Sequence, residues 1–154
     1  MRSQYQLQLK LGQIPIESVK IPEKSRDELP AVLAGLQWIF KNSEVKEEIF
    51  KVLEEKVCGD KKRTGRPGME LWHILILGVV RLALDSDYDR LEYLVHYDVL
   101  LRQIMGLDTI FAGDFGKGFH QKTISENVCH VDEELLKKIN KIIVKAGRPM
   151  LKKK

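Results

Sequence analysis

One run of apolar residues, from Leu71 to Leu84, constrains the fold of this chain more than any other feature. Its apolar residues recur at helical spacing, and Ile76, Leu77 and Val80 also fill the side opposite the main stripe. A helix that is apolar on nearly every side is packed on several sides by other elements. The run is too short for a membrane span, which needs about 20 apolar residues. We therefore predict a central buried helix and no membrane partner.

The length and composition are those of a single small globular protein. A chain of 154 residues has room for one domain with a real core. Hydrophobic residues make up 44% of it and charged residues 31%, an ordinary balance for a soluble protein. Cys58 and Cys129 are far apart without a CxxC motif, and the start MRSQYQ has no apolar signal core. Both features favour a reducing cytoplasm and free thiols.

The periodicity before the central helix predicts a short N-terminal strand or hairpin followed by two helices. Apolar and polar residues alternate over 5–11, as in a half-buried strand, and an extended piece over 14–21 is a candidate partner at a sheet edge. Apolar spacings of three and four then predict helices from Leu29 to about Asn42 and from Ser43 to Val57.

The second half of the chain predicts further helices, each with a start signal. Ser86 with Asp89 forms a capping box for a helix over 87–97, and the helical spacing then continues to a stop at Gly106. A second capping box, Thr123 with Glu126, predicts a short helix over 123–131.

Asp132 is the predicted cap of the last helix, which we expect to end at Gly147. Its Lys138, Lys141 and Lys145 share one outer face. The residues expected to be buried in this helix are Leu135, Leu136, Ile139, Ile142, Ile143 and Ala146.

The predicted fold class is therefore mainly α, a helical bundle with a helix-turn-helix-like C-terminal part. We divide the chain into four segments. These are a strand and two helices over 1–58, a basic linker over 59–68, a helical, helix-turn-helix-like domain over 69–147 and a basic tail over 148–154.

Basic residues gather in three places although the net charge is only +4. They lie at 61–66, along 137–145 and at 148–154. Such clustering favours a polyanionic partner, but lysine-rich solvated faces are also common. The charge pattern alone leaves both interpretations open.

The linker resembles the core of an AT-hook, in which an extended arginine enters a narrow minor groove. The matching residues are Thr64, Gly65, Arg66 and Pro67, but a true hook has arginine where Thr64 stands. Alternatively, glycine and proline simply separate two helical units, and the charges keep the linker soluble.

Short capped helices after a buried one are compatible with a helix-turn-helix whose second, recognition helix is 123–131. Polar residues at the start of this helix and just before it are candidates for contacts with base edges or phosphates. They are Gln121, Lys122, Ser125, Glu126 and Asn127. A plain helical bundle with a polar surface is the alternative.

No active site is visible in the sequence. Asp85, Asp87 and Asp89 imitate the start of an EF-hand, but Arg90 takes the glycine position and His96 the glutamate position. The glycine-rich 106–120 segment lacks the P-loop pattern, and the histidines and cysteines show no zinc spacing. The residues thus indicate a helical binding or assembly module.

The chain resembles the N-terminal region of bacterial insertion-sequence transposases of the ISNCY type. The resemblance runs through LGQIPIESVKIPEKSRDELPAVLAGLQWIF, TGRPGMELWHILILGVVRLALDSDYDRLEYLV, LLRQIMG and QKTISENVCHVDEELLKKINKIIVKAG. Its most specific parts are GRPGMELW, GVVRLAL and DYDRLEYL.

This resemblance implies a larger parent enzyme, a DDE transposase. There a helical region precedes a ribonuclease-H-like domain, whose three carboxylates hold two divalent metals, Mg²⁺ in this family, for strand cleavage and joining. No acidic residue of this chain matches that catalytic set, and the chain stops after the lysine-rich 151–154 segment. We therefore expect a truncated or split transposase with no cofactor and no small-molecule substrate of its own.

The expected function is binding of double-stranded DNA at the element ends, or assembly of the complex that joins them. The expected DNA contacts are Lys61, Lys62, Arg63, Arg66, Gln121, Lys122, Ser125, Asn127, Lys138, Lys141 and Lys145. The alternative is a protein interaction module that dimerises with itself or with full-length transposase and acts as a competitor.

Overall fold

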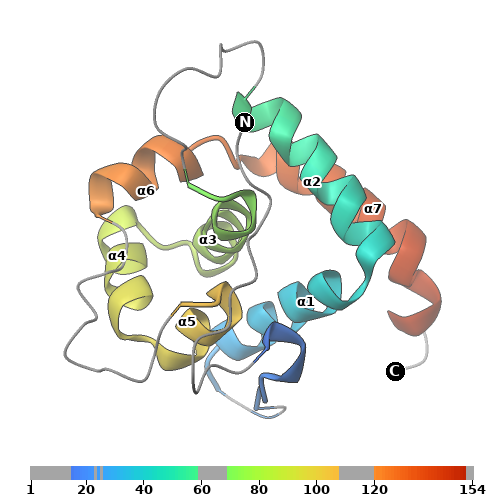
Figure 1. The fold of residues 1–154 in the computed structure, drawn as a ribbon, viewed down its shortest axis with the longest axis horizontal. Coiled ribbons are helices and arrows are strands. Elements are labelled where there is room, and N and C mark those ends of the chain that lie inside the picture. Colours follow the sequence, from blue (N-terminus) through green and yellow to red (C-terminus); the bar gives the residue numbers. More distant parts are fainter. Residues whose placement is uncertain (1–14, 23, 25, 59–68, 108–119, 152–154) are drawn as a thin grey trace.

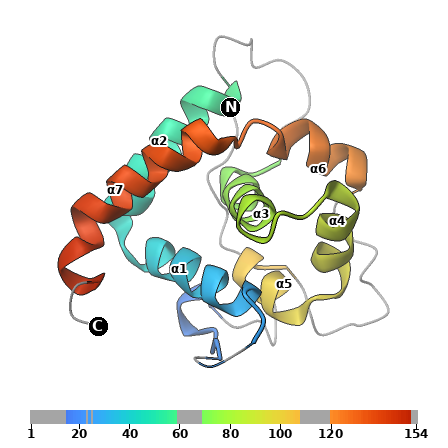
Figure 2. The ribbon, with the colours of Figure 1, turned by 180° about the vertical axis from the view of Figure 1, so that it is seen from behind.

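The computed structural model describes residues 15–22, 24, 26–58, 69–107 and 120–151. Within this part the protein is mainly helical, as predicted, and no strand is present. The elements are η1 (Ile16–Ser18), α1 (Leu29–Lys41), α2 (Ser43–Cys58), α3 (Leu71–Leu84), α4 (Tyr88–Tyr97), α5 (Val99–Met105), α6 (Gln121–Val128) and α7 (Glu133–Leu151). Figures 1 and 2 show α3 in the middle with the other helices around it.

The central helix α3 is buried on nearly all sides, which confirms the prediction from its apolar run. Every residue from Leu71 to Gly78 is buried, and so is Val80. No helix in the described ranges is both long and apolar enough to cross a membrane.

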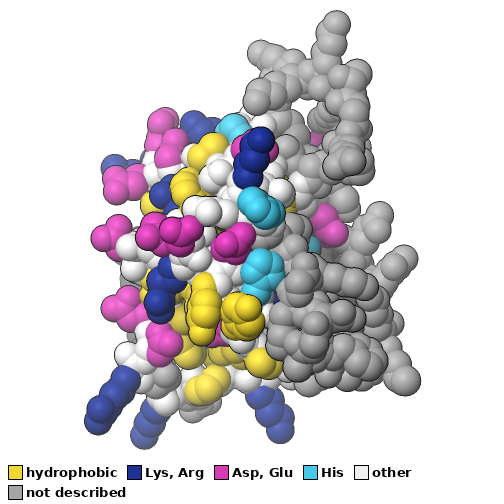
Figure 3. Space-filling view, turned by 90° about the vertical axis from the view of Figure 1, so that its left-hand side faces the viewer, with side chains coloured by type: hydrophobic (Ala, Val, Ile, Leu, Met, Phe, Trp, Pro, Cys, Tyr) yellow, Lys and Arg dark blue, Asp and Glu magenta, His cyan; other side chains and the backbone are white. Residues whose placement is uncertain are grey.

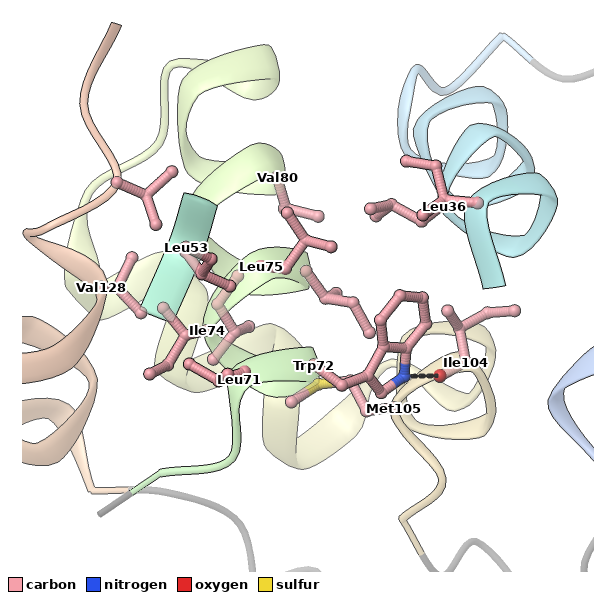
Figure 4. Close-up of a cluster of buried hydrophobic side chains, with 14 of the residues drawn as sticks. Leu36, Leu53, Leu71, Trp72, Ile74, Leu75, Val80, Ile104, Met105 and Val128 are labelled. Carbon is pink, nitrogen blue, oxygen red and sulfur yellow. Dashed lines mark hydrogen bonds between the residues drawn. The ribbon is translucent and has the colours of Figure 1, made fainter. Parts of the chain in front are cut away.

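Trp72 is the largest fully buried side chain and connects three helices to α3 (Figure 4). Its ring lies 4.9 Å from that of Phe40 in α1 and 6.4 Å from that of Phe50 in α2, measured between centroids. Its indole N–H donates a 2.9 Å hydrogen bond to the carbonyl of Ile104 in α5. Because the indole donor is satisfied, the whole ring can be buried without the cost of an unpaired polar group.

The predicted extended piece over 14–21 is wrong in its described part. Ile16–Ser18 form a 3₁₀ turn, and Ile16 and Val19 are buried. The side-chain amide of Gln37 in α1 donates to the carbonyls of Ile16 and Val19, each at 2.8 Å. These buried carbonyls are therefore satisfied by a side chain and need no strand ladder. The strand predicted over 5–11 lies outside the described residues.

The capping box predicted at Ser86 is displaced by one residue. Asp87 caps α4, and its Oδ1 accepts the N–H of Arg90 at 2.8 Å. Ser86 belongs to the end of α3, because Asp85 takes a left-handed conformation (φ 50°) and the Ser86 N–H bonds to the carbonyl of Arg81. The stop predicted at Gly106 is confirmed, with a left-handed backbone (φ 77°).

The last helix begins as predicted but runs further. Asp132 Oδ1 accepts the N–H of Leu135 at 2.9 Å, as expected of the cap. The helix continues through Gly147 and ends at Leu151. The predicted tail is thus helical over 148–151.

Burial along α7 is less complete than predicted. Leu135 and Ile139 are buried, and Ala146 is exposed. The half-buried residues are Leu136, Ile142 and Ile143.

The segments on either side of 59–68 share one core. Helices α2 and α7 lie side by side in both ribbon views (Figures 1 and 2), and α2 also packs on α3. Lys56 near the end of α2 pairs with Asp132 at the start of α7, 3.3 Å apart. The two helices are therefore antiparallel.

A close backbone approach seats the turn between α6 and α7 on α3. A Cβ atom built on Gly78 would lie 2.5 Å from the Cβ of Val131, which is fully buried. Arg81, one turn later, donates to the carbonyl of Val131 at 3.3 Å. The absence of a side chain at position 78 thus permits this close approach of Val131 to α3.

We predict that Gly78→Ala destabilises the fold by about 1–3 kcal/mol, because the new methyl group overpacks the contact with Val131. Gly35→Ala is the matched control. Position 35 is an exposed helical glycine with no atom within 4 Å of a built Cβ, so alanine there should stabilise by up to about 1 kcal/mol. Urea unfolding measures both, and an equal effect of the two changes would refute the close approach.

We also predict a loss of stability in mild acid that depends on His73. Its Nε2–H donates to the carbonyl of Met105 at 2.8 Å. Burial lowers the pKa of His73, although the Met105 carbonyl and Glu70 act to raise it. The unfolded chain therefore takes up the proton below about pH 6.5 while the folded chain resists it, so stability should fall as the pH drops through that value.

The measurement is the urea midpoint of wild type and His73→Gln between neutral pH and about pH 5. Glutamine keeps a donor for Met105 but does not titrate, so its pH dependence should be shallower. Equal slopes for the two proteins would contradict the assignment.

Candidate nucleic-acid interface

The basic face of α7 is the part of the predicted site that the structure brings together. Lys138, Lys141 and Lys145 are all exposed and follow one another at three- and four-residue spacing, away from the buried Leu135 and Ile139. Residues so spaced share one face of a helix. The adjacent Lys137 is exposed as well. We call these four lysines the α7 lysine face.

Acidic side chains on α2 border this face. The exposed acids of α2 are Glu44, Glu47, Glu48 and Glu55. Because the helices are antiparallel, the acidic start of α2 lies beside the lysine-bearing half of α7. Exposed charges influence each other over about 10 Å at ordinary ionic strength.

The start of α7 is held by its cap more than by its ion pair. The pKa of Asp132 is held below its usual value chiefly by the Leu135 N–H, and secondarily by Lys56. Both partners of the Lys56–Asp132 pair are substantially exposed, and such pairs add little stability. At this end of α7 the Asp132 side chain thus serves chiefly as a helix cap on the Leu135 N–H.

Helix α6 starts earlier than predicted, and the Thr123–Glu126 capping box is wrong. His120 is the N-cap, with Nδ1 accepting the N–H of Lys122 at 3.2 Å. Glu92 of α4 accepts the N–H of Gln121 at 2.6 Å. These two acceptors satisfy the N–H groups of Gln121 and Lys122, so the helix has already begun before Thr123.

The four predicted recognition residues of α6 differ in accessibility. Lys122 is exposed, but it lies 4.0 Å from Glu126, which offsets its charge. The Ser125 hydroxyl donates to the carbonyl of Lys122 at 3.0 Å, and Gln121 is half-buried. Asn127 is buried and donates to the carbonyl of Thr123 at 2.7 Å. Asn127 is thus turned into the protein, and Lys122 is the most accessible of the four.

The short turn of this region follows α6 instead of preceding it. Residues 129–132 join α6 to α7, whereas the chain between α5 and α6 spans 106–120. A helix-turn-helix has a turn of about three or four residues before its recognition helix.

The linker candidates Lys61, Lys62, Arg63 and Arg66 lie outside the described residues.

The aspartates that imitate an EF-hand serve as helix ends. Asp87 caps α4, and Asp85 closes α3 in its left-handed conformation. Among the described residues, no group of three or more histidines, cysteines, aspartates or glutamates is placed to hold a metal ion.

One surface feature was missed by the sequence analysis. Tyr93, Tyr97 and Val99 expose 61%, 58% and 51% of their surface, and the two tyrosine rings lie 5.0 Å apart. We call these three residues the tyrosine patch. Figure 3, which faces the left-hand side of Figure 1, shows exposed hydrophobic side chains on this side of the molecule, with both acidic and basic side chains near them. The available signal was two tyrosines four residues apart on the polar side of α4.

No family model matches the chain, and neither a curated protein nor a solved structure matches it. A function must therefore be inferred from its residues and their placement.

We predict that His120→Ala weakens α6 locally, by about the 1 kcal/mol that an N-cap contributes. Amide hydrogen exchange of 121–128 should become faster, while α3 is unaffected. His120→Asn is the control, because asparagine is a strong N-cap and should preserve the protection. If alanine and asparagine behave alike, His120 is not the cap.

Proposed function

We propose that this chain is the DNA-binding and assembly part of an insertion-sequence transposase. In this proposal it holds double-stranded DNA at the element ends and carries no catalytic carboxylates. Strand cleavage and joining belong to a separate domain with bound Mg²⁺. The observation that carries the proposal is the α7 lysine face, which adds exposed lysines on one side of a helix to the sequence resemblance.

The α7 lysine face suits contacts with the DNA backbone. From Lys138 to Lys145 the helix rises about 10 Å, and phosphates repeat along one strand at about 3.4 Å of axis rise. Three lysines can therefore meet phosphates of one strand segment. Phosphate contacts position a protein on the duplex without identifying its sequence.

Base recognition has fewer candidates. Lys122 and Ser125 sit on the outer part of α6, whereas Asn127 is held in the interior by its bond to Thr123. In our proposal α6 adds few base contacts, and Arg63 and Arg66 of the linker supply minor-groove or phosphate contacts. Backbone charge then dominates the affinity, which makes it strongly salt-dependent.

The proposal predicts a specific loss on removing charge from α7. Lys138→Gln, Lys141→Gln and Lys145→Gln together should weaken binding to duplex DNA from the inverted repeats that flank the coding sequence. Each lost phosphate contact should reduce the slope of log affinity against log salt by about 0.9. Fluorescence anisotropy over a salt series measures both quantities.

The matched control removes the same charge elsewhere, through Lys24→Gln, Lys41→Gln and Lys51→Gln, all at exposed positions. It should change the slope much less. Arg63→Ala with Arg66→Ala tests the linker contribution in the same assay. A flat salt dependence of the wild type, or equal losses for the two lysine triples, would contradict the proposal.

A further inference from the structure

His120 caps α6 through a hydrogen bond that only one protonation state of its ring allows. Its Nδ1 accepts the N–H of Lys122 at 3.2 Å. An imidazole nitrogen accepts a hydrogen bond only while it carries no proton, so the capping ring is neutral with its proton on Nε2. A protonated imidazole donates from both nitrogens and accepts at neither. The cap is therefore a bond that acid can remove.

Glu92 of α4 supplies the second acceptor at the start of α6. Its Oε2 lies 2.6 Å from the backbone nitrogen of Gln121, the residue after His120. Negative charge suits the positive end of the helix dipole, whereas a positive charge on His120 would oppose it. Loss of the Nδ1 acceptor and repulsion by the dipole thus act in the same direction. Both weaken the start of α6 when the ring gains a proton.

The charged and titratable groups around this helix start come chiefly from α4 and from α6 itself. On α4, Asp89 and His96 lie one turn before and one turn after Glu92. On α6, Lys122 lies 4.0 Å from Glu126. Figure 3 shows histidine and acidic side chains beside one another on this side of the molecule. The acids attract a protonated ring, but they do not restore the acceptor that the ring has lost.

Helix α3 also packs on α6, and its titratable side chains bond to other groups. His73 bonds to the carbonyl of Met105, and Arg81 bonds to that of Val131, beyond the far end of α6. Neither bond involves the N–H groups at the start of α6. The acid response of this start therefore depends on the ring that caps it.

Exposure separates His120 from the buried His73. His120 is exposed, so its ring exchanges protons with water without any opening of the core. Histidine is the side chain that ordinarily titrates between pH 5 and 8. Ile124 and Val128 are fully buried and anchor the remainder of α6. We propose that α6 has an acid-sensitive start, in which protonation of His120 releases the first turn of the helix while the rest of the fold stays intact.

This inference stands apart from the proposed DNA function. The α7 lysine face belongs to another helix, so a failure of DNA binding would leave the inference untouched. If the chain binds DNA as proposed, acid should weaken the contribution of Lys122 and leave that of the α7 lysine face in place.

Amide hydrogen exchange of the full chain at about pH 7.5 and about pH 5.5 tests the proposal. Protection factors remove the intrinsic pH dependence of exchange. Protection of the 121–124 amides should fall about fivefold in acid, the ratio that loss of a typical N-cap produces. The Leu135 amide is the internal reference, because the lowered pKa of its cap Asp132 keeps that carboxylate charged at both values. A global loss of stability would affect both helices alike.

Two variants assign the effect, and circular dichroism verifies that both fold. His120→Asn keeps an acceptor that does not titrate, so its protection should be the same at the two pH values. Glu92→Gln keeps an acceptor oxygen without the charge, and its acid response should persist because His120 still titrates. Nitrogen NMR of the neutral wild type should place the His120 proton on Nε2.

Five results would each overturn the proposal. They are wild-type protection that is the same at both pH values, an equal fall at the Leu135 amide, an acid response that persists in His120→Asn, an acid response that disappears in Glu92→Gln, and a neutral His120 ring that carries its proton on Nδ1.

Discussion

The enclosure of α3 is the constraint on which the rest of the structure depends. A helix with apolar residues on every side has no face to offer to water, so each of its sides must be covered by another element. Trp72 meets α1, α2 and α5 from within this enclosure. Gly78 allows the turn before α7 to approach the helix backbone. The direction of α7, and hence the outward display of its lysines, follows from packing at the centre.

Features governed by local sequence were predictable. Apolar spacing identified α1, α2 and α3, and the caps at Asp132 and Gly106 were found because a single side chain or glycine decides them. At the other helix starts, the predicted cap was not the residue that the structure uses. Ser86 belongs to the end of α3 and does not cap α4, and His120 caps α6 upstream of the predicted Thr123. Local patterns do not show which of two neighbouring residues the preceding element will use.

Features governed by contacts distant in sequence were not predictable. The 3₁₀ turn η1 is held by Gln37, which donates to carbonyls about twenty positions earlier in the chain. Because the local sequence does not show this contact, the prolines and apolar residues around η1 were predicted to be an edge strand. Asn127 looked available because the direction of α6 is set by α3 and α4, not by its own sequence. The tyrosine patch was overlooked for the same reason, since exposure of Tyr93 and Tyr97 depends on which side of α4 meets the core.

The central functional claim is that polyanions bind along the outer side of α7, and lysine labelling tests it most directly. Acetylation of the folded chain, quantified by mass spectrometry with and without duplex DNA, compares lysines within one molecule. We expect DNA to protect Lys138, Lys141 and Lys145, while Lys51 and Lys56 of α2 keep their reactivity. Equal protection of the two helices, or protection of neither, would contradict the claim.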